Sequence, residues 1–193
     1  VQELQRLLAP VQAGQPIVAV PGAGTNVPIW LLGSSLFSAQ LAAYLGLPYA
    51  FASHFAPRML HQALAIYRQT FKPSAALAKP YAIVGVPVIA APTDAEAQFL
   101  ASSTYQRVLG ILTGNRTRLQ PPVEGFMEQV SERERAAIAD FLAVGIIGGP
   151  QTVRAGLQAL AQATQADEFM LVSDVFDADL RLRSLQLTAQ AMV

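Results

Sequence analysis

Three serine side chains follow the short apolar stretch Leu31-Leu32-Gly33, and they are the residues best suited to bind an anion. Ser34 and Ser35 come directly after the glycine, and Ser38 lies three residues beyond Ser35. A helix that begins here presents free backbone N–H groups and the positive end of its dipole, an arrangement that binds phosphate. Side chains three residues apart share a helix face, so both hydroxyls could add donors. The alternative is an ordinary serine cap after a glycine turn.

Polar residues also follow two other apolar stretches of the chain. Ser53 and His54 come after the second stretch, and Ser173 and Asp174 come after the last one. In a parallel α/β fold the carboxyl ends of the strands carry the chemistry. His54 could therefore act as a general base or donate a hydrogen bond to a ligand. A loop histidine without a neighbouring carboxylate is more often structural or exposed. Asp174 could hold a ligand or cap the next helix.

Other residues with chemical potential have simpler interpretations. Gly148–Thr152 could face a phosphate, but a turn with Pro150 in the first helical turn is favoured. His61 is expected on the surface of a helix, and Trp30 is expected to pack inside the fold because it lies in a predicted strand. The chain contains no Walker loop, no GxGxxG fingerprint and no nucleophile elbow. Its catalytic residues therefore stay unassigned.

Composition excludes several classes of protein. Thirteen basic and thirteen acidic residues give a formal net charge of zero, which argues against a nucleic-acid-binding surface. Hydrophobic residues make up 52% of the chain, which excludes a disordered protein. With no cysteine and two histidines, we expect no metal site. No apolar run reaches ~18 residues and no basic leader precedes Glu3, so we expect a cytoplasmic protein without a membrane span.

Strand-like and helix-like segments alternate along the chain, which predicts a parallel α/β sheet. Four strands are expected in sequential order, with the internal Pro87 weakening regular pairing beyond it. The strands are predicted near 29–32, 49–52, 82–90 and 169–172. The helices are predicted over 1–8, 34–45, 57–71, 93–106, 131–143, 149–163 and 179–192, with capping boxes at Thr93–Glu96 and Ser131–Glu134.

Four stretches resemble the bacterial luciferase-like flavin-dependent monooxygenases, which are (β/α)8 TIM barrels. They are Val27-Pro28-Ile29-Trp30-Leu31-Leu32-Gly33-Ser34-Ser35, the segment 42–52, Thr93-Asp94-Ala95-Glu96-Ala97 and Asp167-Glu168-Phe169-Met170-Leu171. No single one is diagnostic, but their order and spacing are specific. The Leu-Gly-Ser-Ser form is similar to the single-subunit oxidoreductase branch rather than to the light-emitting luciferases.

The resemblance implies that the chain is the C-terminal half of the barrel, strands five to eight, forming one partial domain over 1–193. Residues 110–148 would be an inserted excursion plus a helix within it. A TIM barrel has eight strands. We therefore expect the chain to be a piece of a longer protein and to be inactive alone. Its open sheet edges and uncovered apolar face predict self-association, aggregation or a requirement for the missing half.

The same resemblance implies a flavin site. Its FMN phosphate would lie at Gly33 and the hydroxyls of Ser34, Ser35 and Ser38, while the flavin ring would border Leu32, Phe51, Ala52 and Ser53; His54 would contact substrate. Two departures from the family are visible. The phosphate-binding arginine is expected outside this chain, and Ser34 stands where luciferases carry an acidic residue.

The implied activity is that of an FMN-dependent oxidoreductase of the monooxygenase type. Reduced FMN from a separate flavin reductase would react with O2 and a small organic substrate, in a pocket that excludes water. The full-length protein would be a homodimer. Two alternatives stay open: a relative that uses a deazaflavin, and a non-catalytic half-barrel that binds a phosphate ligand or packs against a partner.

Overall fold

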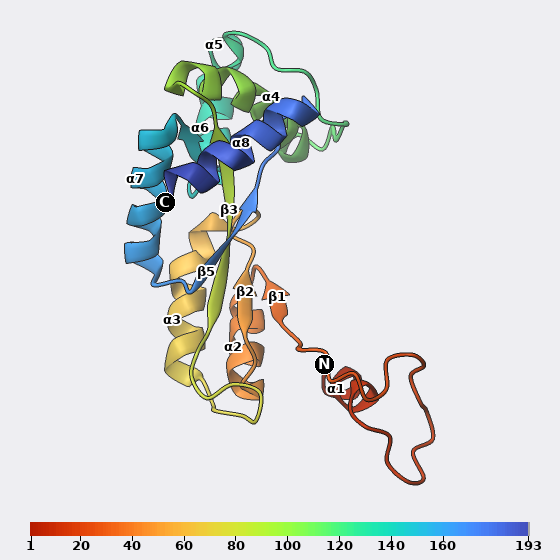
Figure 1. The fold of residues 1–193 in the computed structure, drawn as a ribbon. Helices are drawn as coiled ribbons and strands as arrows, with labels where there is room; N and C mark the ends of the chain where they lie inside the picture. Colours follow the sequence, from red (N-terminus) through yellow and green to blue (C-terminus); the bar gives the residue numbers. More distant parts are fainter. Residues whose placement is uncertain (193) are drawn as a thin grey trace.

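A single parallel sheet runs through the molecule, and the part of the chain that is described, residues 1–192, contributes five strands to it. The structure is a computed structural model. The strands are β1 (Leu31–Gly33), β2 (Tyr49–Phe51), β3 (Ala82–Ala90), β4 (Ile146–Gly148) and β5 (Glu168–Val172). β3 is the long central strand in Figure 1: β2 pairs with its beginning, β5 with its middle and β4 with its end.

The four predicted strands are present, parallel and in sequential order as β1, β2, β3 and β5. The expected total of four was wrong, because β4 also joins the sheet. This strand has only three residues and directly follows a helix, so it carries no periodic signal of its own. The expectation that Pro87 weakens pairing beyond it was also wrong: Val88–Ala90 pair in register with β4.

Helices alternate with these strands. Their bounds are α1 (Gln2–Leu8), α2 (Leu36–Leu45), the 3-10 turn η1 (Pro57–Met59), α3 (Leu60–Thr70), α4 (Asp94–Leu112), α5 (Phe126–Gln129), α6 (Glu132–Phe141), α7 (Pro150–Thr164) and α8 (Ala178–Ala191). Ser131 caps α6 with a full capping box, as predicted. The box predicted at Thr93–Glu96 is only half formed: the Thr93 hydroxyl accepts from the Glu96 N–H, but the Glu96 side chain does not bond back to Thr93. α4 runs six residues past its predicted end at Gln106, because the apolar helical pattern continues through Val108, Leu109 and Leu112. The short helix α5 was not predicted.

One face of the sheet is covered by helices. In Figure 1, α2 and α3 lie along β1, β2 and the beginning of β3, while α7 and α8 lie further along β3. Alternate strand residues, such as Tyr49, Phe51, Val84 and Val86, are fully buried against them. A second core gathers α4, α6 and the end of β3, with Ile138 and Ile89 among its buried residues. This face therefore anchors the strands in a fixed register.

The opposite face of the sheet is uncovered over β1, β2 and the first half of β3 in the described residues, whereas Ile89, in the same alternating row at the end of β3, is buried in the second core. Leu32 and Met170, which belong to the other alternating row, are 71% and 61% exposed. The N-terminal segment does not cover them: α1 buries none of its residues, and Figure 1 shows it extending away from the sheet. An apolar sheet face open to its surroundings is thus the prominent surface of the fold.

Candidate functional site

A cavity of about 420 Å³ lies on the uncovered face of the sheet. Four of the predicted site residues, Leu32, Phe51, Ala52 and His54, border it. The remaining lining residues are Trp30, Ala50, Ile83, Gly85 and Met170. Its walls are therefore almost entirely apolar, and His54 is the side chain in them that can titrate. Volume and lining are in the range of small-molecule and cofactor pockets.

The strand register explains why these residues meet. Leu32 pairs with Ala50 and Ala50 with Ile83, so the three share one row across β1, β2 and β3. Gly85 pairs with Met170 in the next row. In a strand, alternate residues point to opposite faces. The cavity is thus lined mainly by those residues of each strand that point to the uncovered face of the sheet.

The start of α2 has the geometry of a serine cap. The Ser35 hydroxyl accepts from the Ser38 N–H at 3.3 Å, and the Ser38 hydroxyl donates to the Ser35 carbonyl at 2.7 Å and lies 3.0 Å from the Tyr49 hydroxyl. Burial raises the pKa of Tyr49, so its hydroxyl stays protonated. A Cβ at Gly33 would collide with the Ser38 side chain. Glycine is therefore needed for Ser38 to pack under the turn.

This geometry bears on the anion site expected there. The Ser38 hydroxyl is already engaged with Ser35 and Tyr49. The N–H groups of the first turn, at Leu36 and Phe37, have no acceptor within the helix. Ser34 lies just before them and is half-buried. The cap predicted as the alternative is present, and backbone donors for an anion remain beside it.

Two residues expected beside a flavin ring lie deeper than the cavity surface. The Phe51 ring is fully buried in the core and packs edge-on to Tyr49 at 6.2 Å. Ser53 is fully buried, and its hydroxyl donates to the Gly85 carbonyl. That bond ties the end of β2 to β3. Ala52 is also buried, at 4% exposure, so Leu32 offers the most open surface of the predicted ring contacts.

His54 sits over Gly85. A Cβ on Gly85 would lie 2.7 Å from Nδ1 of His54, so the imidazole occupies the space that a side chain would fill. Its ring packs on Phe55 with 4.2 Å between centroids. Burial lowers the pKa of His54, which favours the neutral imidazole. A neutral histidine at the edge of an apolar cavity can accept or donate a hydrogen bond.

Asp174 forms an ion pair instead of a helix cap. Its carboxylate lies 2.5 Å from Nη2 of Arg107, and both side chains are about one-third exposed. Asp177 caps α8, because its Oδ1 accepts from the N–H groups of Asp179 and Leu180. The capping alternative for Asp174 was wrong because Asp174 lies three positions before Asp177, which is the cap of α8.

The second helix start, at α7, is satisfied from within the chain. The N–H of Gly149 donates to Oδ1 of Asp94 at 2.6 Å. This bond lowers the pKa of Asp94, with a contribution from the Thr152 side chain. A carboxylate therefore already lies where an anion would bind, in agreement with the simpler interpretation of this loop.

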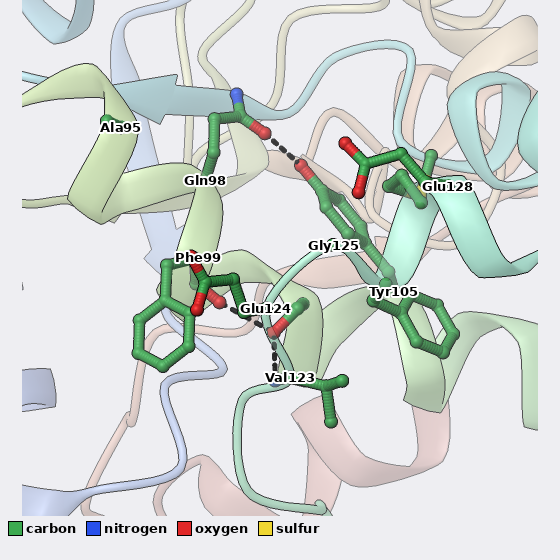
Figure 2. A pocket seen from close by; sticks show the side chains of 11 residues that line it. Ala95, Gln98, Phe99, Tyr105, Val123, Glu124, Gly125 and Glu128 are labelled. Atoms are coloured by element: carbon green, nitrogen blue, oxygen red, sulfur yellow. Dashed lines mark hydrogen bonds between the residues drawn. The ribbon is translucent and has the colours of Figure 1, made fainter.

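A larger cavity of about 540 Å³ lies between α4 and residues 123–128. Figure 2 shows the hydrogen bond between the Tyr105 hydroxyl and the Gln98 side chain. The Tyr105 hydroxyl donates to Oε1 of Gln98 at 2.6 Å, and the Ser102 hydroxyl accepts from the N–H of Val123 at 2.7 Å. The carboxylates of Glu124 and Glu128 lie at its rim. None of the predicted site residues borders it, so it lies outside the site predicted from the sequence.

The sequence interpretation missed two contributors. Trp30 was expected in the core but is 36% exposed, because it precedes β1, lines the cavity and meets Tyr81 edge-on at 5.5 Å. Arg107 was not singled out at all. The available signal was that Arg107 is the one charged residue between Glu96 and the end of α4. Within residues 1–192 no cluster of metal-ligating side chains is found, and no helix there is both long and apolar enough to cross a bilayer.

Comparison with known proteins places this geometry in a family. The family model described as Luciferase-like monooxygenase matches residues 3–167. YvbT of Bacillus subtilis (strain 168) is 49% identical over 171 residues, which cover 89% of this chain and 51% of YvbT. A luciferase-like monooxygenase of Escherichia coli (strain K12) is 48% identical over 168 residues, covering 87% of this chain and 50% of that protein. The chain thus spans about half the length of the curated relatives it matches.

Solved structures agree. Apo-MsnO8 has a TM-score of 0.74 and 33% identity, and the match covers 92% of this chain and 54% of that one. Two more distant structures share the fold. The oxygenating constituent of 3,6-diketocamphane monooxygenase from Pseudomonas putida, in complex with FMN, has a TM-score of 0.60 and 19% identity. That match covers 95% of this chain and 54% of the other. An F420-dependent secondary alcohol dehydrogenase, in complex with an F420-acetone adduct, has a TM-score of 0.58 and 10% identity, and the match covers 92% of this chain and 52% of that one. The chain belongs to the luciferase-like monooxygenase family, and its parallel α/β fold is that of half of the family's barrel.

Proposed function

We propose that the protein containing this chain is an FMN-dependent oxidoreductase of the luciferase-like monooxygenase type, acting with O2 on a small organic substrate. A separate reductase would supply the reduced flavin, and the full-length protein would be a homodimer. The observation that carries the proposal is the apolar cavity on the uncovered face of the sheet, beside the start of α2. Family membership and a neighbouring structure in complex with FMN support it.

In this proposal the flavin ring lies against the apolar wall formed by Trp30, Leu32, Ile83 and Met170. These side chains are open to a ligand, since Leu32 and Met170 are more than half exposed. A planar aromatic ring packs well on such surfaces and displaces water from them. Phe51 and Ala52 support the wall from below, and Ser53 holds β2 and β3 in register.

The flavin phosphate would lie at the start of α2. Its oxygens would accept from the first-turn N–H groups and from the hydroxyls of Ser34 and Ser35, with the helix dipole adding a favourable field. Ser38 would reach the phosphate only by releasing its bond to the Ser35 carbonyl. Its main contribution is then to hold the turn in place, together with Gly33 and Tyr49.

When bound, the reduced flavin supplies the capacity to activate O2. The residues of this chain bind and orient it and keep water away from the apolar side of the cavity. His54 would hydrogen-bond the substrate from the rim, as a neutral imidazole at pH 7. No residue here is assigned the role of catalytic base.

Binding of FMN and riboflavin to the full-length protein tests the proposal, with flavin fluorescence as the readout. Ser34→Ala and Ser35→Ala should each weaken FMN about tenfold or more, because a hydrogen bond to a charged group contributes roughly 1.5–3 kcal/mol. Riboflavin lacks the phosphate and should be affected much less.

Ser131→Ala is the matched control. It removes an equivalent capping box from α6, so it should lower stability without changing the preference for FMN over riboflavin. Equal losses for the two flavins in the Ser34 and Ser35 variants would refute the phosphate position. Binding of F420 in place of FMN would favour the deazaflavin alternative, and binding of neither would refute the proposed function.

A further inference from the structure

One charged residue lies on the strands of the sheet in residues 1–192, and its side chain points to the uncovered face. This residue is Glu168, the first of β5. Phe169 and Leu171 pack against the helix-covered core, so Glu168 and Met170, which alternate with them, point the other way. Glu168 pairs with Ile83, which lines the cavity of about 420 Å³. A carboxylate therefore stands in an otherwise apolar row of side chains.

Two aromatic side chains lie at the same end of the sheet as this carboxylate. The Tyr81 hydroxyl donates to Oε1 of Glu168 at 2.6 Å, and the ring of Trp30 meets that of Tyr81 edge-on at 5.5 Å. Trp30 directly precedes β1, Tyr81 directly precedes β3 and Glu168 begins β5. We call these three residues the amino-end cluster, because they mark the amino ends of their strands. The start of α2 follows the carboxyl end of β1, so the cluster is separate from the proposed phosphate position.

Tyr81 satisfies only part of the Glu168 carboxylate. Its hydroxyl is the one donor to that side chain within residues 1–192, and no basic group of that range lies at ion-pair distance from it. The neighbouring Asp167 is also an acid and already accepts from the Ala82 N–H, at 2.7 Å. Glu168 is exposed in this chain, so water can complete its hydrogen bonds. Under an apolar cover it would be a lone buried charge, which is strongly destabilising.

The charge on this face decides what can cover it. A second copy of the chain has no cation on its described strands, so two such faces in contact would bury two carboxylates without a partner. The remainder of the protein is the better cover. The matched part of this chain accounts for 51% of YvbT and 54% of apo-MsnO8, so about as much protein again is available to close over the face. That remainder can supply the opposite charge.

We propose that the part of the full-length protein outside residues 1–193 covers the amino-end cluster and places a basic side chain against the Glu168 carboxylate. The rings of Trp30 and Tyr81 beside it provide aromatic surface that also attracts a cation. Such a pair would fix the register of the covering strand, because a slip of one residue turns the basic side chain to the other face and leaves Glu168 alone. The pair acts in assembly of the fold and needs no bound flavin.

Double-mutant cycles in the full-length protein test the pair, with urea denaturation as the readout. Glu168→Gln leaves the proposed cation unpaired and should lower the urea midpoint. Glu132→Gln, at an exposed glutamate of α6, is the matched control and should change the midpoint little. Each lysine and arginine outside residues 1–193 is then replaced by methionine, alone and together with Glu168→Gln. For one of them the double variant should be more stable than the two single effects predict, by about tenfold or more in the folding equilibrium constant.

Lys79→Met tests whether the partner lies within this chain, since Lys79 is the basic residue nearest to Tyr81 in the sequence. Its effect should add to that of Glu168→Gln. The proposal is overturned if Lys79 is the coupled residue, if no basic residue outside residues 1–193 is coupled, or if Glu168→Gln lowers the midpoint no more than Glu132→Gln. Should a single variant not fold, recovery of the fold in the double variant supports the pair, and failure of the double variant overturns it. All measurements are made without flavin, so they do not depend on the proposed function.

Discussion

Replacing Gly33 with alanine places a methyl group where the Ser38 side chain lies. Ser38 cannot simply rotate away, because the clash includes its Cβ as well as its hydroxyl. Either the first turn of α2 moves or the end of β1 does. Both carry the proposed phosphate site, so Gly33→Ala should lower the stability of the protein and its affinity for FMN together.

The loss of stability can be worked out in two parts. Overpacking costs about 1–3 kcal/mol. Displacing the Ser38 hydroxyl breaks its bonds to the Ser35 carbonyl and the Tyr49 hydroxyl, each contributing roughly 0.5–1.5 kcal/mol. Gly33→Ala should therefore destabilise the protein by about 2–6 kcal/mol. Ser38→Ala breaks the same bonds without the clash and should cost about 1–3 kcal/mol.

Urea denaturation of the full-length protein measures both variants, with equal m-values showing that the midpoints are comparable. The difference between the two variants in free energy of unfolding isolates the cost of the steric clash. If Gly33→Ala were no more destabilising than Ser38→Ala, the close approach of Gly33 to Ser38 would not constrain the fold, and the reasoning would be refuted.

Three further predictions concern titration and the cavity wall. Burial lowers the pKa of His54, so just below pH ~6.5 the imidazole is protonated in the unfolded chain and still neutral in the folded chain. The free energy of unfolding should therefore fall as the pH decreases through this range. His54→Gln should make that fall shallower in a series of urea midpoints measured at different pH values. Since the Gly149 N–H lowers the pKa of Asp94, its stabilisation is complete above pH ~3.9 and is lost as pH falls through the folded pKa. Asp94→Asn should therefore lower the melting temperature at pH 7, and the difference from wild type should shrink as the pH falls into the acid range; a difference that does not shrink with decreasing pH would contradict this. Met170→Arg should abolish flavin binding at nearly unchanged stability, because Met170 is 61% exposed, whereas Leu182→Arg on α8, at 56% exposure, should leave fluorescence titrations as in wild type.

Local chemistry was enough to predict the order of elements and most of their starts. The capping box of Ser131 and the caps at Ser35 and Thr93 involve residues only three apart, so they form whenever a helix begins there. Apolar stretches bounded by helices predicted four of the strands and their parallel order. The stretch at 146–148 was missed because a three-residue strand exists only through its pairing with β3.

The site depended on contacts between distant residues. Adjacent strands had to be aligned before Leu32, Ala50 and Ile83 could form one wall, and the lack of a side chain at Gly85 had to coincide with the end of β2 before His54 could lie there. Arg107 and Asp174 are 67 residues apart, and no local pattern joins them. Backbone propensities and helix caps act over a few residues, so they can be predicted from the sequence. The cavity and its charges arise from packing across the sheet, where register and the uncovered face select which side chains meet.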